Sequence, residues 1–93
     1  MSLRSVQRTV VICNKRGLHA RAAARFVKLA ETFASEVTVT RRDQAVSGRS
    51  IMGLMMLAAT PGSSIEIAAK GEDAALAVSS LSDLVERRFD EDA

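Results

Sequence analysis

The chain has 93 residues, 47% of them hydrophobic and 26% charged, which suits one small domain with a modest core rather than a disordered segment. A net charge of +2, with three Phe and no Trp or Tyr, gives no support for nucleic-acid binding. The sequence shows neither a signal peptide nor the roughly 20 apolar residues of a membrane span, and its single cysteine, Cys13, cannot form an internal disulfide. We therefore expect a cytoplasmic protein that binds neither nucleic acid nor membrane.

The N-terminal half alternates between strand and helix patterns. An apolar run predicts a strand over residues 6–13, and a polar segment ending at Gly17 breaks it. Apolar residues at i, i+3, i+4 and i+7 then predict a helix over residues 19–33. Strict alternation over residues 37–40, followed by a charged turn and residues 45–47, predicts a β-hairpin.

The C-terminal half contains three more predicted elements. Ser50 is a suitable N-cap for a short helix over residues 51–58, and alternation predicts a fourth strand over residues 64–70. Glu72-Asp73 then places negative charge at the start of a last helix, where the helix dipole favours it. Arg87-Arg88 is expected in its last turn. Its apolar stripe consists of Ala74, Ala77, Val78, Leu81, Leu84 and Val85.

The order of these elements, βαββαβα, predicts the fold class. The economical packing is α+β: one four-stranded antiparallel sheet covered on one side by three helices, an open-faced sandwich. We treat residues 1–93 as a single domain, ordered from about residue 6 to residue 89. The acidic tail over residues 90–93 is expected to fray.

His19 is the only histidine, and it stands where the first helix is predicted to begin. Unpaired N–H groups and partial positive charge make a helix start a suitable place for an anion. The same dipole disfavours imidazolium and so favours the neutral, nucleophilic imidazole. A phosphoryl group on this ring would face the helix N–H groups and could receive a charge-assisted hydrogen bond from Arg21. On position alone, however, a lone histidine at a helix start is usually a structural capping or surface residue.

The short predicted helix over residues 51–58 is almost entirely apolar, so it cannot bury every side chain. Its core face is predicted to hold Ile51, Leu54 and Leu57 or Ala58, while Met52, Met55 and Met56 point partly elsewhere. Exposed methionines suit a surface that meets several partners, and neighbouring cations would favour an acidic one. The alternatives are methionines that fill gaps in the core and a basic helix face that is only solvated. The cations concerned are Arg21, Arg25 and Lys28.

Other chemistry has little support in the sequence. One histidine and one cysteine cannot form a dedicated zinc site without carboxylates, and no P-loop, dinucleotide motif or catalytic triad is present. We expect no metal and no cofactor. Ser50 allows a second hypothesis besides capping, because a phosphate at a helix start would add about −1.5 to −2 charge to the surface without breaking the fold.

Two motifs together carry a resemblance to a known family. Gly17-Leu18-His19-Ala20-Arg21 is followed by Ser50-Ile51-Met52-Gly53-Leu54-Met55, in a βαββαβα chain of this length. This combination closely resembles HPr, the histidine-containing phosphocarrier family of the bacterial phosphoenolpyruvate-dependent phosphotransferase system. The resemblance covers about residues 6–89, and the fold it implies is the open-faced β-sandwich.

The resemblance implies a phosphoryl carrier with a transient phosphohistidine rather than an enzyme. His19 matches the histidine that enzyme I phosphorylates on Nδ1, with phosphate drawn from phosphoenolpyruvate. Arg21 matches the arginine beside the phosphohistidine, and the backbone of Ala20 and Arg21 would bind the phosphate. Ser50 matches the serine that an ATP-dependent HPr kinase/phosphorylase modifies in many bacteria.

The resemblance also implies the partners. Enzyme I and the acceptor IIA proteins would dock on Ile51, Met52 and Met55. To these the charge pattern adds the basic residues Arg25 and Lys28 as expected docking residues. A carrier that must dock twice is best served as a monomer.

Two positions depart from the usual family pattern. Ala22 stands where the family usually has proline, and alanine preserves the helix while loosening its start. Arg49 replaces a frequent lysine next to the regulatory serine and keeps its charge.

Three functions stay open at this point. The first is a phosphocarrier for sugar uptake, and the second is a regulatory phosphocarrier of a nitrogen or carbon signalling branch without sugar transport. The third is an interaction module controlled through Ser50 and never phosphorylated on histidine. The presence of both His19 and Arg21 argues against the third, because such a module has no physical need for them.

Overall fold

The computed structural model describes residues 4–92, and its elements confirm the predicted βαββαβα order. The predicted fold class is also confirmed, because the four strands form one antiparallel sheet in the order β1-β4-β2-β3. The elements are β1 (Ser5–Val11), α1 (Ala20–Ala30), β2 (Glu36–Arg41), β3 (Gln44–Ser47), α2 (Ile51–Met56), β4 (Ser64–Lys70), α3 (Ala74–Glu86) and the short 3₁₀-helix η1 (Arg88–Asp90).

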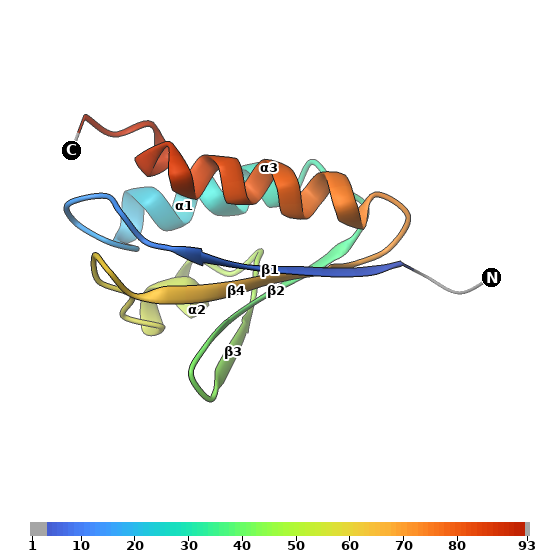
Figure 1. Ribbon diagram of the computed structural model, residues 1–93, viewed down its shortest axis with the longest axis horizontal. Coiled ribbons are helices and arrows are strands. Elements are labelled where there is room, and N and C mark those ends of the chain that lie inside the picture. Colours follow the sequence, from blue (N-terminus) through green and yellow to red (C-terminus); the bar gives the residue numbers. More distant parts are fainter. Residues whose placement is uncertain (1–3, 93) are drawn as a thin grey trace.

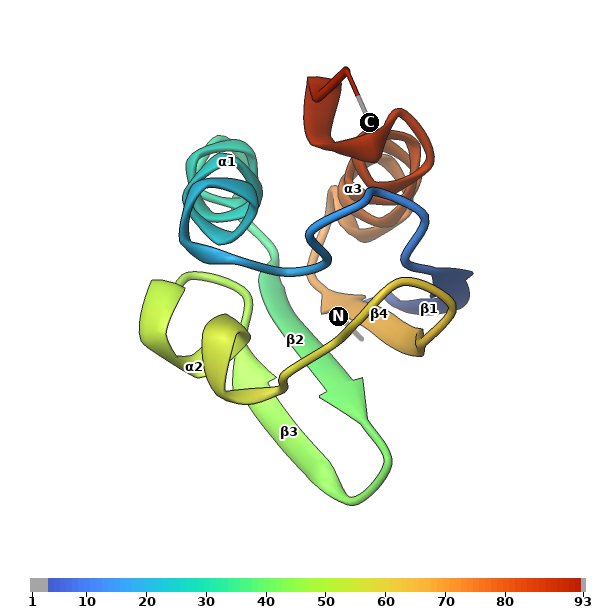
Figure 2. The ribbon, with the colours of Figure 1, turned by 90° about the vertical axis from the view of Figure 1, so that its left-hand side faces the viewer.

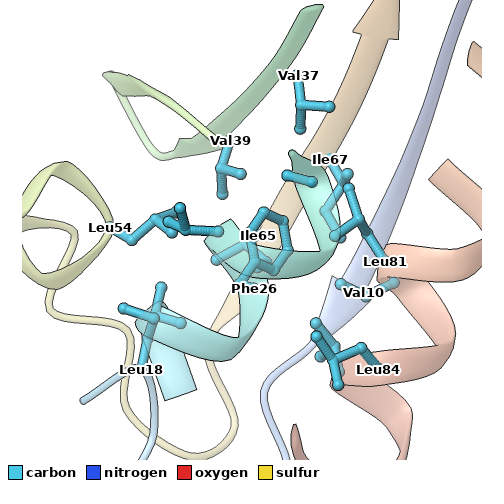
Figure 3. Packing of buried hydrophobic residues seen from close by; sticks show 14 of the residues in the cluster. Val10, Leu18, Phe26, Val37, Val39, Leu54, Ile65, Ile67, Leu81 and Leu84 are labelled. Carbon is cyan, nitrogen blue, oxygen red and sulfur yellow. The ribbon is translucent and has the colours of Figure 1, made fainter. Parts of the chain in front are cut away.

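The layers follow from the alternation of the strands. Ile65, Ile67 and Ala69 of β4 point inward, as predicted, and are almost fully buried. Helices α1 and α3 lie over this face of the sheet and leave the other face open (Figure 1). Phe26 of α1 and Leu81 of α3 meet the strand residues in one core (Figure 3). Among residues 4–92 no helix is long and apolar enough to cross a membrane.

Helix α2 packs beside α1 and against β3, which is an edge strand. Leu54 and Leu57 are buried, as predicted for its core face, and Leu54 reaches the main core (Figure 3). Ile51 was expected on that face too, but it is 41% exposed, and Ala58 is exposed as well. Because α2 has only six residues and lies at the edge of the sheet, its first turn extends past the core.

Side-chain contacts between elements shape the ends of α1 and α3. Helix α1 ends at Ala30, three residues earlier than predicted, and Arg49 donates to the carbonyl oxygen of Phe33 at 2.8 Å. Asp73 is the N-cap residue of α3, where the sequence placed its negative charge, but its side chain makes no hydrogen bond to the start of the helix. Its carboxylate instead accepts hydrogen bonds from the backbone N–H groups of Ala34 and Ser35, both at 2.9 Å, and from the Ser35 hydroxyl. The negative charge predicted at the start of α3 therefore also fixes the α1–β2 connection.

The C-terminal end differs most from the prediction. Helix α3 ends at Glu86, so Arg87 is its C-cap and Arg88 already lies beyond it. Residues 88–90 follow with φ values of 59°, 54° and 60°, three successive left-handed residues without a glycine. Phe89 is fully buried and Glu91 contacts His19, whereas fraying was expected from residue 90 onward. Ala93, the last residue of the predicted tail, lies outside the described residues.

Candidate functional site

The loop before α1 is fixed by hydrogen bonds to its own backbone and to the segment after α2. The side-chain amide of Asn14 donates to the Gly17 carbonyl oxygen at 2.7 Å, and Leu18 N–H donates to the Ala59 carbonyl oxygen at 2.9 Å. Gly17 has φ +66°, and a β-carbon there would lie 2.4 Å from the Ala59 oxygen. Only glycine combines an easily adopted positive φ with the absence of a β-carbon. Gly17 therefore fixes the path of the backbone into His19.

His19 is the N-cap of α1, and both of its ring nitrogens have partners. The backbone N–H of Arg21 donates to Nδ1 over 3.4 Å, and Nε2 lies 2.6 Å from Oε2 of Glu91. The side chain is 22% exposed, so one edge of the ring remains open to solvent. The helix starts directly after His19, as the sequence predicted.

Glu91 is the residue of this site that the sequence did not indicate. Its side chain is only 12% exposed, and its other oxygen accepts a hydrogen bond from the Asn14 amide at 2.9 Å. Burial alone raises the pKa of the Glu91 carboxyl, but hydrogen bonds from Asn14 and His19, together with the positive charge of Arg21, outweigh it and lower that pKa. Glu91 is therefore ionised at neutral pH, 72 residues away in sequence from the ring it contacts.

A polar cleft of about 470 Å³ is lined in part by Glu91, the residue that contacts the histidine. Its lining mixes basic residues near the start of α1 with acidic residues of the C-terminal segment. Arg21 lines this cleft, and its side chain is exposed. The lining residues are Lys15, Arg16, Arg21, Arg25, Asp90, Glu91 and Asp92.

The two other basic residues of α1 lie in different surroundings. Arg25 is half-buried, and its guanidinium donates a hydrogen bond to the carbonyl oxygen of Phe89 within the molecule. Lys28 is exposed in the last turn of α1. Of the two cations predicted to dock partners, the structure therefore leaves Lys28 at the surface and ties Arg25 to the C-terminal segment.

Helix α2 lies at the same end of the molecule as the start of α1, which His19 precedes (Figure 2). Its exposed apolar side chains form a patch there. Met52 is 73% exposed, and Ile51, Met55 and Met56 are exposed as well. Ser50 caps this helix, because its Oγ accepts a hydrogen bond from Gly53 N–H at 2.9 Å. Ser50 is half-buried at the start of the patch, and a phosphate on its hydroxyl would add negative charge there.

Ala22 is fully buried in the first turn of α1. The helix forms at the predicted position without a proline there, and the small methyl group packs into the core. Within residues 4–92, no group of three or more His, Cys, Asp and Glu side chains is placed to hold a metal ion.

Comparisons of the sequence with known proteins agree on one family. The profile described as "PTS HPr component phosphorylation site" matches residues 6–87. Phosphocarrier protein HPr of Neisseria meningitidis is 49% identical over 86 residues, which cover 92% of this chain and 97% of that protein. Phosphocarrier protein NPr of Shewanella violacea is 42% identical over 86 residues, with coverages of 92% and 94%.

Solved structures lead to the same family. HPr of Thermoanaerobacter tengcongensis superimposes with a TM-score of 0.90 at 40% identity, covering 95% of this chain and 99% of that one. A second structure, of an HPr dimer from the same organism, gives a TM-score of 0.74 at 41% identity, with coverages of 88% and 94%. Because sequence and fold both match over almost the whole length, the chain belongs to the HPr family of phosphocarriers of the phosphotransferase system.

Proposed function

We propose that His19 accepts a phosphoryl group on Nδ1 from phosphorylated enzyme I and passes it to IIA proteins. The observation that carries this proposal is the placement of the ring: Nδ1 accepts a hydrogen bond from Arg21 N–H at the start of α1, and Nε2 is bound to the Glu91 carboxylate. A nucleophilic nitrogen at a helix start has the phosphate-binding groups already around it.

The mechanism uses groups that are already in position. The Nδ1 lone pair attacks phosphorus while the bond from phosphorus to the donor breaks, and the donor keeps that electron pair. The Arg21 N–H, which donates to Nδ1 over a long 3.4 Å, is then free to donate to a phosphoryl oxygen. Together with the Ala20 N–H and the Arg21 guanidinium it would stabilise the charge on the transferring group. The carrier is regenerated when an acceptor takes the phosphoryl group, so it is a reactant rather than an enzyme.

The test is phosphorylation by purified enzyme I with labelled phosphoenolpyruvate. The wild-type protein should acquire acid-labile label, and His19→Ala should acquire none while keeping its fold. An unlabelled wild-type protein, with enzyme I active on another carrier, would contradict the proposal. A labelled His19→Ala protein would place the acceptor elsewhere.

A regulatory branch is a second candidate for the acceptor, because a relative at 42% identity is named NPr. In that case the phosphoryl group passes to IIA proteins of nitrogen or carbon signalling and no sugar is transported. Measuring transfer from the labelled protein to sugar-specific and regulatory IIA proteins side by side distinguishes the two. The better acceptor identifies the branch.

We further propose that Ser50 is a regulatory phosphorylation site, modified by an HPr kinase/phosphorylase. We expect Ser50→Asp to lower kcat/KM for phosphorylation by enzyme I by about tenfold, because negative charge beside Met52 and Met55 repels a partner attracted by basic residues. The matched control is Ser79→Asp on the exposed side of α3. Equal rates in the two variants would contradict a docking role for this surface.

The proposal also covers the cellular compartment and the oligomeric state in which the carrier acts. We propose that the carrier acts in the cytoplasm, where phosphoenolpyruvate and its partners are found. We also propose that it acts as a monomer, because enzyme I and IIA proteins would use the same patch of α2 in turn. The dimer described for the T. tengcongensis relative is a property of that protein.

A further inference from the structure

The C-terminal segment reaches His19 through an uncommon backbone conformation. Residues 88–90 are all left-handed, a conformation that residues other than glycine avoid and that persists only where surrounding contacts enforce it. Two contacts do so here: Phe89 is fully buried, and Arg25 of α1 donates to its carbonyl oxygen. The turn reverses the chain after α3 and brings Glu91 onto the imidazole.

The partners of the imidazole fix where its proton lies. A carboxylate only accepts hydrogen bonds, so the nitrogen facing Glu91 at 2.6 Å must carry the hydrogen. A backbone N–H only donates, so the nitrogen facing Arg21 must present its lone pair. Both partners therefore select the same neutral tautomer, with hydrogen on Nε2 and a lone pair on Nδ1.

The Glu91 carboxylate is itself held in place. Its second oxygen accepts from the amide of Asn14, and that amide also donates to the Gly17 carbonyl oxygen in the loop before His19. Asn14 is fully buried, so this bridge is shielded from water. The loop, the ring and the C-terminal segment thus form one connected network.

We propose that Glu91 is a positioning residue that keeps the ring proton on Nε2 throughout the transfer cycle. The left-handed turn, anchored by Arg25 and Phe89, places the Glu91 carboxylate against the ring. The proposal deepens the proposed function and rests on it. When Nδ1 forms its bond to phosphorus, no proton has to leave that nitrogen, because none is there. The ring then carries a positive charge opposite the Glu91 carboxylate, and when an acceptor takes the phosphoryl group, the neutral Nε2–H imidazole is restored.

The first test is nitrogen NMR of the unphosphorylated protein at alkaline pH, where the imidazole is neutral. In the wild type, Nε2 should have the chemical shift of a protonated ring nitrogen and Nδ1 that of an unprotonated one. Glu91→Ala should shift both toward the average of two tautomers, whereas the matched control Asp92→Ala, exposed in the same segment, should not. A wild type with hydrogen on Nδ1, or a Glu91→Ala spectrum identical to the wild type, would overturn the proposal.

A second variant tests the turn that delivers the carboxylate. Arg25→Ala removes the hydrogen bond to Phe89 without changing any group that touches the ring, and it should shift the ring nitrogens in the same direction as Glu91→Ala. An unchanged spectrum would overturn the anchoring role of Arg25. The tautomer is read before any partner is added, so an effect of Arg25 on docking cannot imitate this result.

Kinetics then connect the tautomer to transfer. Glu91→Ala should lower kcat for phosphorylation by enzyme I on the order of tenfold and leave KM within about twofold, because it disturbs the nucleophile and not the docking patch. A loss confined to KM would contradict a positioning role. If the wild type took no phosphate at all, the proposed function would fail, while the NMR comparison would still decide the tautomer.

Discussion

At the scale of single residues, Gly17 and Asn14 determine how the chain reaches His19. Position 17 requires both a left-handed backbone and the absence of a β-carbon, which only glycine provides. The Asn14 amide joins the loop before His19 to the C-terminal segment through hydrogen bonds to Gly17 and Glu91. The motif containing Gly17 and His19 was visible in the sequence. The role of Asn14 was not, because its partner Glu91 lies 77 residues further along the chain.

Gly17→Ala should destabilise the protein more than Gly62→Ala. Both glycines are left-handed, with φ values of +66° and +91°, so each substitution carries a backbone cost of about 1–2 kcal/mol. A β-carbon at residue 62 meets nothing within 4 Å, whereas at residue 17 it meets the Ala59 oxygen at 2.4 Å, and overpacking typically adds about 1–3 kcal/mol. Thermal unfolding measures the difference, at roughly 4–8 °C per kcal/mol. Equal melting temperatures would contradict the close approach to Ala59.

At the scale of elements, the sequence predicted all four strands and three helices, because period-2 and helical apolar patterns were clear. The ends were less predictable, since side chains from other elements decide them. Arg49 binds a carbonyl beyond α1, and the side chain of Asp73 binds the α1–β2 connection rather than the N–H groups of α3. The turn at residues 88–90 had no signal at all, because a left-handed run without glycine contradicts local preference and depends on the burial of Phe89.

The Asp73 contacts predict how stability depends on pH. The hydrogen bond from the Ser35 hydroxyl, followed by that from Ala34 N–H, lowers the pKa of the Asp73 carboxyl below its ordinary value of 3.8. Because the folded state has the lower pKa, the stabilisation is complete above the ordinary value and is lost as the pH falls through the folded-state value.

Asp73→Asn should therefore lower the melting temperature at pH 7 and lose less stability between neutral and acidic pH than the wild type. Thermal unfolding over a series of pH values measures this, with Glu72→Gln as the exposed neighbouring control. Parallel pH profiles for Asp73→Asn and the wild type would contradict the stabilising role of the ionised carboxylate.

At the scale of the whole molecule, the start of α1 and helix α2 lie at one end (Figures 1 and 2). His19 directly precedes α1, and the exposed apolar patch belongs to α2. A partner that covers this end reaches Nδ1 and the methionines together. This arrangement agrees with the proposal of a single docking surface, used first by a phosphoryl donor and then by an acceptor. In the sequence, the motif around His19 and the motif that begins at Ser50 are separate. The packing of α1 against α2 brings these two motifs together.

The central claim is that Nδ1 of His19 carries the phosphoryl group. The most direct measurement is phosphorus and nitrogen NMR of the protein after reaction with enzyme I and phosphoenolpyruvate, with the ring nitrogens labelled. The account predicts a phosphorus nucleus coupled to Nδ1 of His19 and a hydrogen retained on Nε2. Phosphorus on Nε2 or on another side chain, or an unmodified ring under conditions that phosphorylate a known carrier, would contradict it.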